Sequence, residues 1–502
     1  MAINCKNFIG GNWKAGSSLE VIENMNPVNF EKVSEANISS ADDVLEAIQH
    51  AEAAFYKWKS IPAPNRGEIL YRIGEVLKER KHKLAELITL EIGKTKVEAE
   101  GEVQEAIDMA YYMAGEGRRM FGQTIPSELP NKWAMSVREP VGVIGAISAF
   151  NFPVAVPSWK IFPSLILGNT VIWKPSLETS AISNEFMRCF EEGGLPPGVL
   201  NLILGGQEAG QTIVEDPRVV HISFTGSTET GRKVYQQAAG HLKRVSLELG
   251  GKNAVIVLKD ANLELAADGV VWAAFGTSGQ RCTSASRVIV EEEIYEAFIE
   301  KLIQKTSNLT VGDGRNDGVD VGPLINENAV QKMESYIASA KESGSEILHG
   351  GKRYQKKQGH FFQPTIIGPV DSENRLVKEE IFGPILSVIK AEDFNHALQI
   401  NNASRYGLST ALFTKDVNDA FKGIREMDTG IVYVNHGTTG AEIQLPFGGT
   451  KDTGNGLREA GQAALDAFSE WKSVYVDYSN QLQRAQIDTD QLFSHLIQDE
   501  TN

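Results

Sequence analysis

The chain has 502 residues, 42% hydrophobic and 23% charged, an ordinary globular composition with length for two to four domains. The 49 Lys and Arg residues against 65 Asp and Glu residues give a formal charge of −16, which argues against nucleic acid or anionic lipid as a partner. The three cysteines, Cys5, Cys189 and Cys282, form neither a disulfide framework nor a zinc-binding spacing, so no metal site is expected.

The N-terminal half of the chain begins with helical patterns. Its first residues, MAINCKNFIGGNW, lack the apolar segment of a signal peptide, and no run of 18 uncharged apolar residues follows. We therefore expect a cytoplasmic protein without a membrane partner. Residues 41–120 carry apolar side chains at three- and four-residue spacing, with Ser40 as a candidate N-cap, and this pattern predicts helices.

After Pro126 the pattern changes to strands, because SVREPVGVIGAISAF alternates and is rich in β-branched residues. Between residues 140 and 260, strand-like stretches such as NAVIVL alternate with helical ones such as TGRKVYQQAAG, which predicts a parallel α/β sheet. The alternation restarts beyond LELGGKN and predicts a second α/β domain. The C-terminal WKSVYVDYS predicts a strand that residues 136–140 can pair with, in this subunit or another.

Three polar residues near predicted strand ends are candidates for chemistry. Asn151 can donate its amide N–H to a developing oxyanion, or it serves as a turn residue before proline. Lys174 can reach a nucleotide ribose or phosphate, or it faces solvent. Glu248, among the apolar residues of SLELGGKN, can have a raised pKa and act as a general base, or it is a salt-bridged structural carboxylate.

Two loops are candidates for nucleotide binding. Gly226 and Ser227 precede a helix expected to begin near Thr228, where backbone N–H groups suit a pyrophosphate, although the spacing is not G-x-G-x-x-G. Glu380 and Phe382 precede a Gly-Pro turn in KEEIFGPIL, where the carboxylate can accept hydrogen bonds from ribose hydroxyls or belong to a charged loop.

Cys282 lies in FGTSGQRCTSAS, where small residues leave a thiol accessible and the neighbouring Arg281 favours thiolate. Most cysteines are instead small core hydrophobes. The other candidates decide between these interpretations. A thiol, an oxyanion donor, a base and a nucleotide site together describe one reaction, which a random set of residues rarely does.

These motifs resemble those of the aldehyde dehydrogenase superfamily. That family's order is kept by FNFP, WKPS, FTGSTETG, LELGGKN, GQRC, EEIFGP and LPFGG, across residues 140–450. The resemblance implies an α/β fold with two Rossmann-like parallel-sheet domains and a small β-strand oligomerisation element, in homodimers or homotetramers. The expected boundaries are a nucleotide-binding domain at 1–122 and 141–251, a catalytic domain at 252–471, and oligomerisation strands and tail at 123–140 and 472–502.

The resemblance also implies NAD- or NADP-dependent oxidation of an aldehyde to a carboxylic acid through a cysteine thioester. Glu248 favours hydrolysis of that thioester over acyl transfer to coenzyme A. The implied roles are nucleophile for Cys282, general base for Glu248, oxyanion amide for Asn151, ribose binding for Lys174 and Glu380, phosphate contact for Ser227, and packing near the nicotinamide riboside for Phe382.

The cofactor and substrate preferences rest on departures from the family pattern. Many NAD-preferring members carry a glutamate three residues after the lysine; here that residue is Leu177, with Glu178 one step later, so we expect NADP to be tolerated. Arg281 either binds a substrate carboxylate or supports its loop through a salt bridge. Together with Glu105 it matches substrate-binding positions of the aminoadipate-semialdehyde branch, and other stretches look like bacterial ketoglutarate-semialdehyde dehydrogenases.

The sequence therefore predicts oxidation of a semialdehyde that carries a distant carboxylate. Two alternatives stay open: a broad-specificity aliphatic aldehyde dehydrogenase, and a catalytically retired relative kept as a binding or structural protein. The intact set of Cys282, Glu248 and Asn151 argues against the second alternative.

Overall fold

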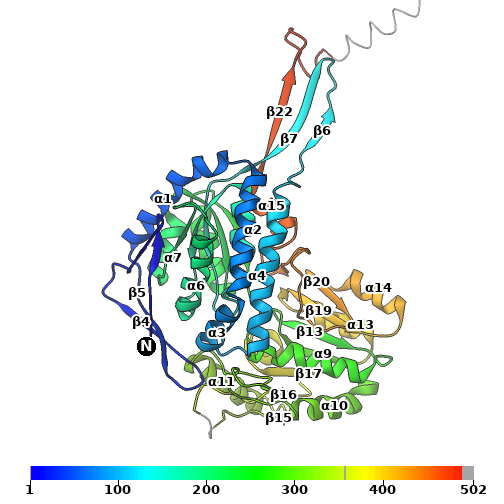
Figure 1. Cartoon of the computed structure of the whole chain (residues 1–502). Helices are drawn as coiled ribbons and strands as arrows, with labels where there is room; N and C mark the ends of the chain where they lie inside the picture. The colour runs from blue at the N-terminus through cyan, green and yellow to red at the C-terminus, as the bar shows by residue number, and fades with distance from the viewer. Residues whose placement is uncertain (1, 355–357, 489–502) are drawn as a thin grey trace, which may run out of the picture.

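The computed structural model describes residues 2–354 and 358–488, and within them two seven-stranded sheets form the centres of two lobes (Figure 1). The last part of the expected C-terminal tail, residues 489–502, lies outside the described residues. The strands of the first sheet, in spatial order, are β12 (Arg244–Glu248), β11 (Val219–Thr225), β8 (Val143–Ile147), β9 (Thr170–Lys174), β10 (Leu200–Leu202), β2 (Asn7–Ile9) and β3 (Asn12–Lys14).

The first sheet is parallel from β12 to β10, and β2 and β3 continue it antiparallel. Side chains along β8 alternate between two cores, with Ile144 in one and Val143 in the other, because successive strand residues point to opposite faces. Helices therefore cover both faces, as the alternating pattern predicts. They are α1 (Ala41–Ser60), α2 (Ala63–Glu79), α3 (Lys81–Ile92), α4 (Lys96–Glu116), α5 (Ala155–Leu167), α6 (Ser180–Glu192), α7 (Gln207–Glu215) and α8 (Thr228–Ala239).

The second sheet is parallel except for its edge strand β15. Its strands, in spatial order, are β15 (Ile347–His349), β16 (Thr365–Ile367), β17 (Ile385–Ala391), β14 (Ala285–Glu291), β13 (Asn253–Val257), β19 (Ser409–Phe413) and β20 (Ile431–Val434). Its helices are α9 (Leu263–Phe275), α10 (Tyr295–Ser307), α11 (Glu327–Glu342), α12 (Arg375–Lys378), α13 (Phe394–Asn402) and α14 (Val417–Glu426). The expectation of two parallel α/β sheets is confirmed.

A third sheet projects from the body as an arm (Figure 1). It consists of β22 (Ser469–Asp477), β7 (Lys132–Pro140) and β6 (Gln123–Pro126), all antiparallel. The C-terminal strand thus pairs with residues 132–140 of its own chain, which answers the question that the sequence left open. The pairing begins at Ser469, inside the range that the sequence assigned to the catalytic domain.

Several shorter elements complete the fold. They are the sheet of β1 (Ile3–Cys5), β5 (Lys32–Asn37) and β4 (Val21–Met25), the pair β18 (Tyr406–Gly407) and β21 (Thr450–Lys451), the helix α15 (Ala463–Ala467), and the 3₁₀ turns η1 (Leu177–Thr179), η2 (Gly276–Gly279) and η3 (Glu292–Ile294). The chain around α15 returns to the first lobe, where Ala464, Leu465 and Phe468 join its core. No helix among residues 2–354 and 358–488 combines the length and apolar character needed to cross a bilayer.

Candidate active site

The site lies where the two lobes meet. Lys174, Thr225 and Glu248 end three parallel strands of the first sheet, β9, β11 and β12, so they lie along its carboxyl edge, as parallel sheets predict. The second lobe faces them with the amino edge of its sheet, where its parallel strands begin. There the residues that precede β14 and β17, including Cys282 and Glu380, approach the site before their strands begin. The strand-end rule therefore located only the first half of the site.

The loop that carries Cys282 follows α9 and is shaped by unusual backbone angles. Thr277 and Ser278 have φ values of 51° and 56°, and such left-handed positions cost energy that the surroundings must supply. Gly279 also has a positive φ, and a Cβ there would collide with the carbonyl of Gly383. These small residues turn the chain sharply and bring Cys282 to the wall of a cavity of about 340 Å³.

Two contacts fix the position of Cys282. The Nδ2 of Asn253 donates to the Cys282 carbonyl at 2.7 Å. Gly251 packs against the same carbonyl so closely that an added Cβ would lie 2.6 Å from it. Cys282 is half-buried as a residue and lines the cavity, whereas Cys5 and Cys189 are buried in the core of the first lobe. Cys282 is thus the thiol placed to meet a ligand.

The electrostatic setting of Cys282 differs from the sequence-based expectation. Burial raises the pKa of the thiol to about 12, and the carboxylates of Glu248 and Glu380 add to the rise. The neighbouring Arg281, expected to favour thiolate, is instead paired with Glu98 at 2.7 Å. The expectation was wrong because the guanidinium turns away to its own counter-ion, while two acidic residues face the thiol.

Asn151 lies beside the nucleophile loop. It is buried, and its Nδ2 donates to the carbonyl of Gln280 at 3.0 Å. An amide nitrogen carries two N–H donors, so one bond holds the loop and one donor remains for a second acceptor. The placement suits the oxyanion role that the family resemblance implies.

Glu248 is the last residue of β12, and its buried carboxyl lines the same cavity as Cys282. Burial raises the pKa of this carboxyl well above its usual range, and the neighbouring Glu459 raises it further. Gly448 leaves room for the carboxyl, because a Cβ at that position would lie 2.6 Å from Oε1 of Glu248. A carboxyl with a raised pKa can exchange protons near neutral pH.

A buried polar cluster behind Glu248 was missed in the sequence. Lys160 in α5 forms an ion pair with Glu459, and the hydroxyl of Ser223 donates to Glu459 Oε1 at 3.1 Å. All three side chains are buried, and Glu459 lines the cavity beside Glu248. The signal in the sequence was one lysine in the otherwise apolar segment AVPSWKIFPSLIL. A charge at such a position needs a buried partner.

Other polar groups in the cavity have no partner among the described residues. The hydroxyls of Thr225 and Thr439 and the indole N–H of Trp159 are buried and line the cavity, yet they make no hydrogen bond there. Buried polar atoms are normally satisfied, so such atoms indicate a place for water or for a polar ligand. None of these three residues was singled out from the sequence.

The candidate cofactor residues lie along the carboxyl edge of the first sheet and across from it. Burial lowers the pKa of Lys174 to about 8, and its ammonium makes one hydrogen bond within the described part of the chain, to the carbonyl of Pro175 at 3.3 Å. Lys174 shares a cavity with Leu177 and Glu178. An ammonium with such sparse bonding fits a ligand that brings hydroxyl or phosphate acceptors.

The remaining cofactor candidates also have suitable surroundings. Ser227 is the N-cap of α8, directly after Gly226, as the sequence predicts. Glu380 Oε1 accepts a hydrogen bond from the backbone N–H of Gly251 at 3.0 Å, and its other oxygen packs against Gly250. Phe382 has a φ of 58° and packs edge-on against Phe150. These residues fit a dinucleotide with a pyrophosphate at the helix start and a ribose at Glu380.

Comparison with known proteins identifies the family. The aldehyde dehydrogenase family model matches residues 13–474. The chain is 40% identical to the alpha-ketoglutaric semialdehyde dehydrogenase of Bacillus subtilis over 475 residues, covering 94% of this chain and 97% of that protein. The chain belongs to the aldehyde dehydrogenase family. The suspected resemblance is confirmed, and with it oxidation of aldehydes as the activity and NAD(P) as the cofactor.

Two further proteins are similar to this aldehyde dehydrogenase over nearly its whole length. It is 38% identical to aldehyde dehydrogenase family 7 member A1 of Malus domestica, over 95% of this chain and 94% of that protein. The crystal structure of betaine aldehyde dehydrogenase from Staphylococcus aureus in complex with NAD⁺ superposes with a TM-score of 0.93 at 34% identity, over 96% of each chain.

The lining of the dehydrogenase cavity also includes the two residues expected to bind substrate. Arg281 donates through Nε to Thr277 Oγ1 at 2.8 Å and through Nη2 to Glu98 Oε1 at 2.7 Å, so the loop-supporting salt bridge exists. Three of its five N–H groups remain available as hydrogen-bond donors. Glu105 makes no hydrogen bond or ion pair among the described residues, and burial raises its pKa to about 8. Both residues line the cavity with Cys282.

The described part of the dehydrogenase contains no group of three or more His, Cys, Asp or Glu residues arranged to hold a metal ion. The strand ends predicted Lys174 and Glu248 as candidates, the helix start predicted Ser227, and only tertiary packing revealed the cluster of Lys160, Ser223 and Glu459.

Proposed function

We propose that this aldehyde dehydrogenase oxidises a semialdehyde bearing a distant carboxylate, with Cys282 as nucleophile, Glu248 as general base and Asn151 as oxyanion donor. The observation that carries the proposal is the convergence of these groups. A thiol and a buried carboxyl with a raised pKa line one cavity, and an amide with a spare donor holds the loop beside them.

The reaction follows from the placement of these groups. Cys282 gives its thiol proton to solvent, and its sulfur attacks the aldehyde carbon. The carbonyl π bond opens, and the oxyanion that forms accepts hydrogen bonds from the Asn151 amide and the Cys282 backbone N–H. Lys174, Ser227, Glu380 and Phe382 would hold NAD(P), which would supply the two-electron oxidant for this step. Glu248 then takes a proton from a water molecule that attacks the resulting thioester. The acid leaves and the thiol is regenerated.

Cofactor choice depends on the cavity at Lys174. Leu177 occupies the position where many NAD-preferring members have glutamate, but Glu178 lines the same cavity and accepts a hydrogen bond from Ser176. We expect NADP to be used less well than NAD because this carboxylate faces a 2′-phosphate, yet to be tolerated. Glu178→Gln should raise kcat/KM for NADP by about tenfold, since it removes one close like-charge contact, with little change for NAD.

Steady-state assays with both cofactors check this prediction. Wild-type turnover with NADP below about one-thousandth of that with NAD would remove the idea of tolerance, since such a ratio corresponds to several kcal/mol of repulsion. An equal response of the Glu178→Gln enzyme to both cofactors would show that Glu178 does not face the 2′ position.

The substrate class is supported by Arg281 and Glu105 in the cavity lining, and by the name of the Bacillus subtilis relative, alpha-ketoglutaric semialdehyde dehydrogenase. Arg281→Ala should raise KM for a semialdehyde acid by roughly 10- to 100-fold, the value of a charged hydrogen bond, and KM for propanal far less. Glu98→Gln is the matched control, because it breaks the loop salt bridge and leaves the guanidinium in place. Equal effects on both substrates in the Arg281→Ala enzyme would refute the carboxylate clamp.

A broad-specificity aliphatic aldehyde dehydrogenase is the second candidate, and one observation favours it. Arg281 already has Glu98 as a counter-ion, and Glu98, Glu102 and Glu105 together make the cavity lining rich in carboxyl groups. A small aldehyde panel assayed by NADH absorbance separates the two candidates by selective turnover of semialdehyde acids or turnover of all aldehydes.

We also propose that the chain assembles into a homodimer or homotetramer through its arm. The arm is a single sheet, and its large apolar side chains are exposed. They include Trp133, Trp471, Tyr475 and Val476. Such a surface normally marks a protein interface. Light scattering should give a dimer or tetramer mass, and Val476→Asp should lower it, whereas Leu19→Asp in an exposed loop should not. A monomeric wild-type mass would exclude the proposal. The cytoplasmic location stays a prediction that cell fractionation would test.

A further inference from the structure

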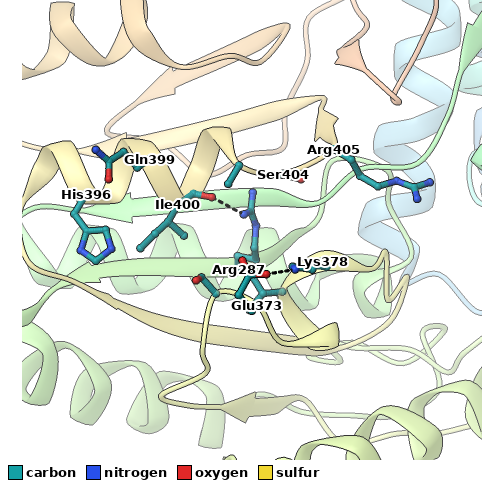
Figure 2. Close-up of a pocket in the computed structure, with 11 residues that line it drawn as sticks. Arg287, Glu373, Lys378, His396, Gln399, Ile400, Ser404 and Arg405 are labelled. Atoms are coloured by element: carbon teal, nitrogen blue, oxygen red, sulfur yellow. Dashed lines mark hydrogen bonds and ion pairs between the residues drawn. The ribbon is translucent and has the colours of Figure 1, made fainter.

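A second cavity, of about 350 Å³, lies in the second lobe between β14, α12 and α13 (Figure 2). Arg287, Lys378, His396, Gln399 and Ser404 are among the residues that line it. None of the catalytic or cofactor residues described above does so. The cavity is therefore separate from the dehydrogenase site and needs an explanation of its own.

Arg287 is the unusual residue in this cavity. The residue is 2% exposed, and its three hydrogen bonds to the described residues all go to backbone carbonyls: Nε and Nη2 donate to Lys252 at 3.0 and 2.7 Å, and Nη1 donates to Ile400 at 3.2 Å. No carboxylate in the described part of the chain pairs with it. Burial lowers the pKa of the guanidinium to about 10, which still leaves it charged at neutral pH. A buried cation without a counter-ion is costly.

The neighbouring charges do not supply that counter-ion. Glu373 is the acidic residue of the cavity lining, and it pairs with Lys378. Arg405 points away, as Figure 2 shows, and pairs with Asp452 at 3.1 Å. The cavity thus keeps an excess of positive charge, on a chain whose formal charge is −16.

We infer that this cavity binds a small oxyanion, a phosphate or a carboxylate, next to Arg287. A guanidinium has five N–H donors, three of which are used, and the remaining two can meet the oxygens of a phosphate or carboxylate group. The hydroxyls of Ser372 and Ser404 line the cavity and can serve as further donors. The volume accommodates a small metabolite that carries such a group, not only the bare ion.

The site is linked to the cofactor region through the backbone. Arg287 holds the carbonyl of Lys252, and the adjacent Gly251 donates its N–H to Glu380, the candidate ribose-binding carboxylate. Occupancy of the cavity can therefore shift the position of Glu380. We expect an anion bound there to change KM for NAD and to leave kcat nearly unaltered. This expectation rests on the proposed role of Glu380, whereas the binding itself does not.

Gln399→Glu provides the test, because this exposed residue lines the cavity and the substitution adds a negative charge with almost no change in shape. Gln304→Glu on α10 is the matched control, since Gln304 is also exposed but does not line the cavity. Inorganic phosphate and glutarate are titrated separately into each full-length protein by calorimetry, with melting temperature as a second readout. The two probes distinguish a phosphate site from a carboxylate site.

We expect at least one probe to bind the wild-type and Gln304→Glu proteins equally and the Gln399→Glu protein about fivefold or more weakly, the effect of one nearby like charge. The KM for NAD should respond to that probe in the first two proteins and not in the third. Equal binding by all three proteins, or binding of neither probe, would overturn the inference. A KM response that is identical in all three would place the anion in the cofactor site instead.

Discussion

Cys282→Ala is expected to lower kcat by roughly 10⁴-fold or more, because removal of a covalent nucleophile abolishes the main route and leaves only binding and polarisation. The other two thiols cannot replace it. Cys5 and Cys189 are buried in the core of the first lobe, and burial raises the pKa of each to about 12. Steady-state NADH formation measures the loss.

Two controls separate loss of chemistry from loss of structure. Cys282 is partly exposed at a cavity wall, so its truncation to alanine should leave the melting temperature and NAD binding near the wild-type values. Cys189→Ala, in contrast, removes a fully buried group and should lower the melting temperature while leaving kcat unchanged. Activity retained in the Cys282→Ala enzyme would refute the nucleophile assignment.

Glu248→Gln is expected to lower steady-state turnover by about 10²- to 10⁴-fold, the usual contribution of a general base. The loss should fall on thioester hydrolysis. The first turnover should persist, because glutamine removes a carboxylate that raises the pKa of the Cys282 thiol and so makes thiolate easier to form. Rapid-mixing measurements should therefore show a burst of NADH close to one equivalent per site, followed by almost no turnover. A burst lost in proportion to turnover would contradict this role.

The pH dependence of turnover tests the cause of the raised pKa. Glu248 must be ionised to act as a base, so its raised folded-state pKa means that activity falls as the pH drops through that value. Glu459→Gln removes the largest charge contribution to the rise. It should lower the pKa of Glu248 and move the acidic limb of the kcat profile to lower pH. A limb that does not move would assign the titration to another group.

Local sequence patterns predicted much of this molecule. The alternation of apolar residues marks the strands and helices because it records which face of each element is buried, and β8 shows the result, with Ile144 and Val143 in different cores. Glu248 and Lys174 were candidates because polar residues at the carboxyl ends of parallel strands lie where such sheets bind ligands. The family motifs then supplied Cys282, Asn151 and Glu380, which patterns alone left open.

What the patterns could not predict depends on contacts between distant segments. Lys160 and Glu459 are 299 residues apart, and Arg281 and Glu98 are 183 apart. Periodicity reports burial but not the partner, so the ion pair behind Glu248 and the salt bridge of Arg281 were out of reach. The direction of the Cys282 pKa shift was mistaken for the same reason, since the charge of an adjacent residue counts less than the charges that the fold brings near.

The acyl-enzyme is the species that tests the central assignment most directly. The Glu248→Gln enzyme is mixed with NAD and a semialdehyde acid, quenched in acid, digested, and analysed by mass spectrometry. We expect the peptide containing Cys282 to gain the mass of one acyl group only when NAD is in the mixture, and the wild-type enzyme to show little of this adduct. An unmodified Cys282 peptide after a full NADH burst, or an acyl group on another residue, would contradict this expectation.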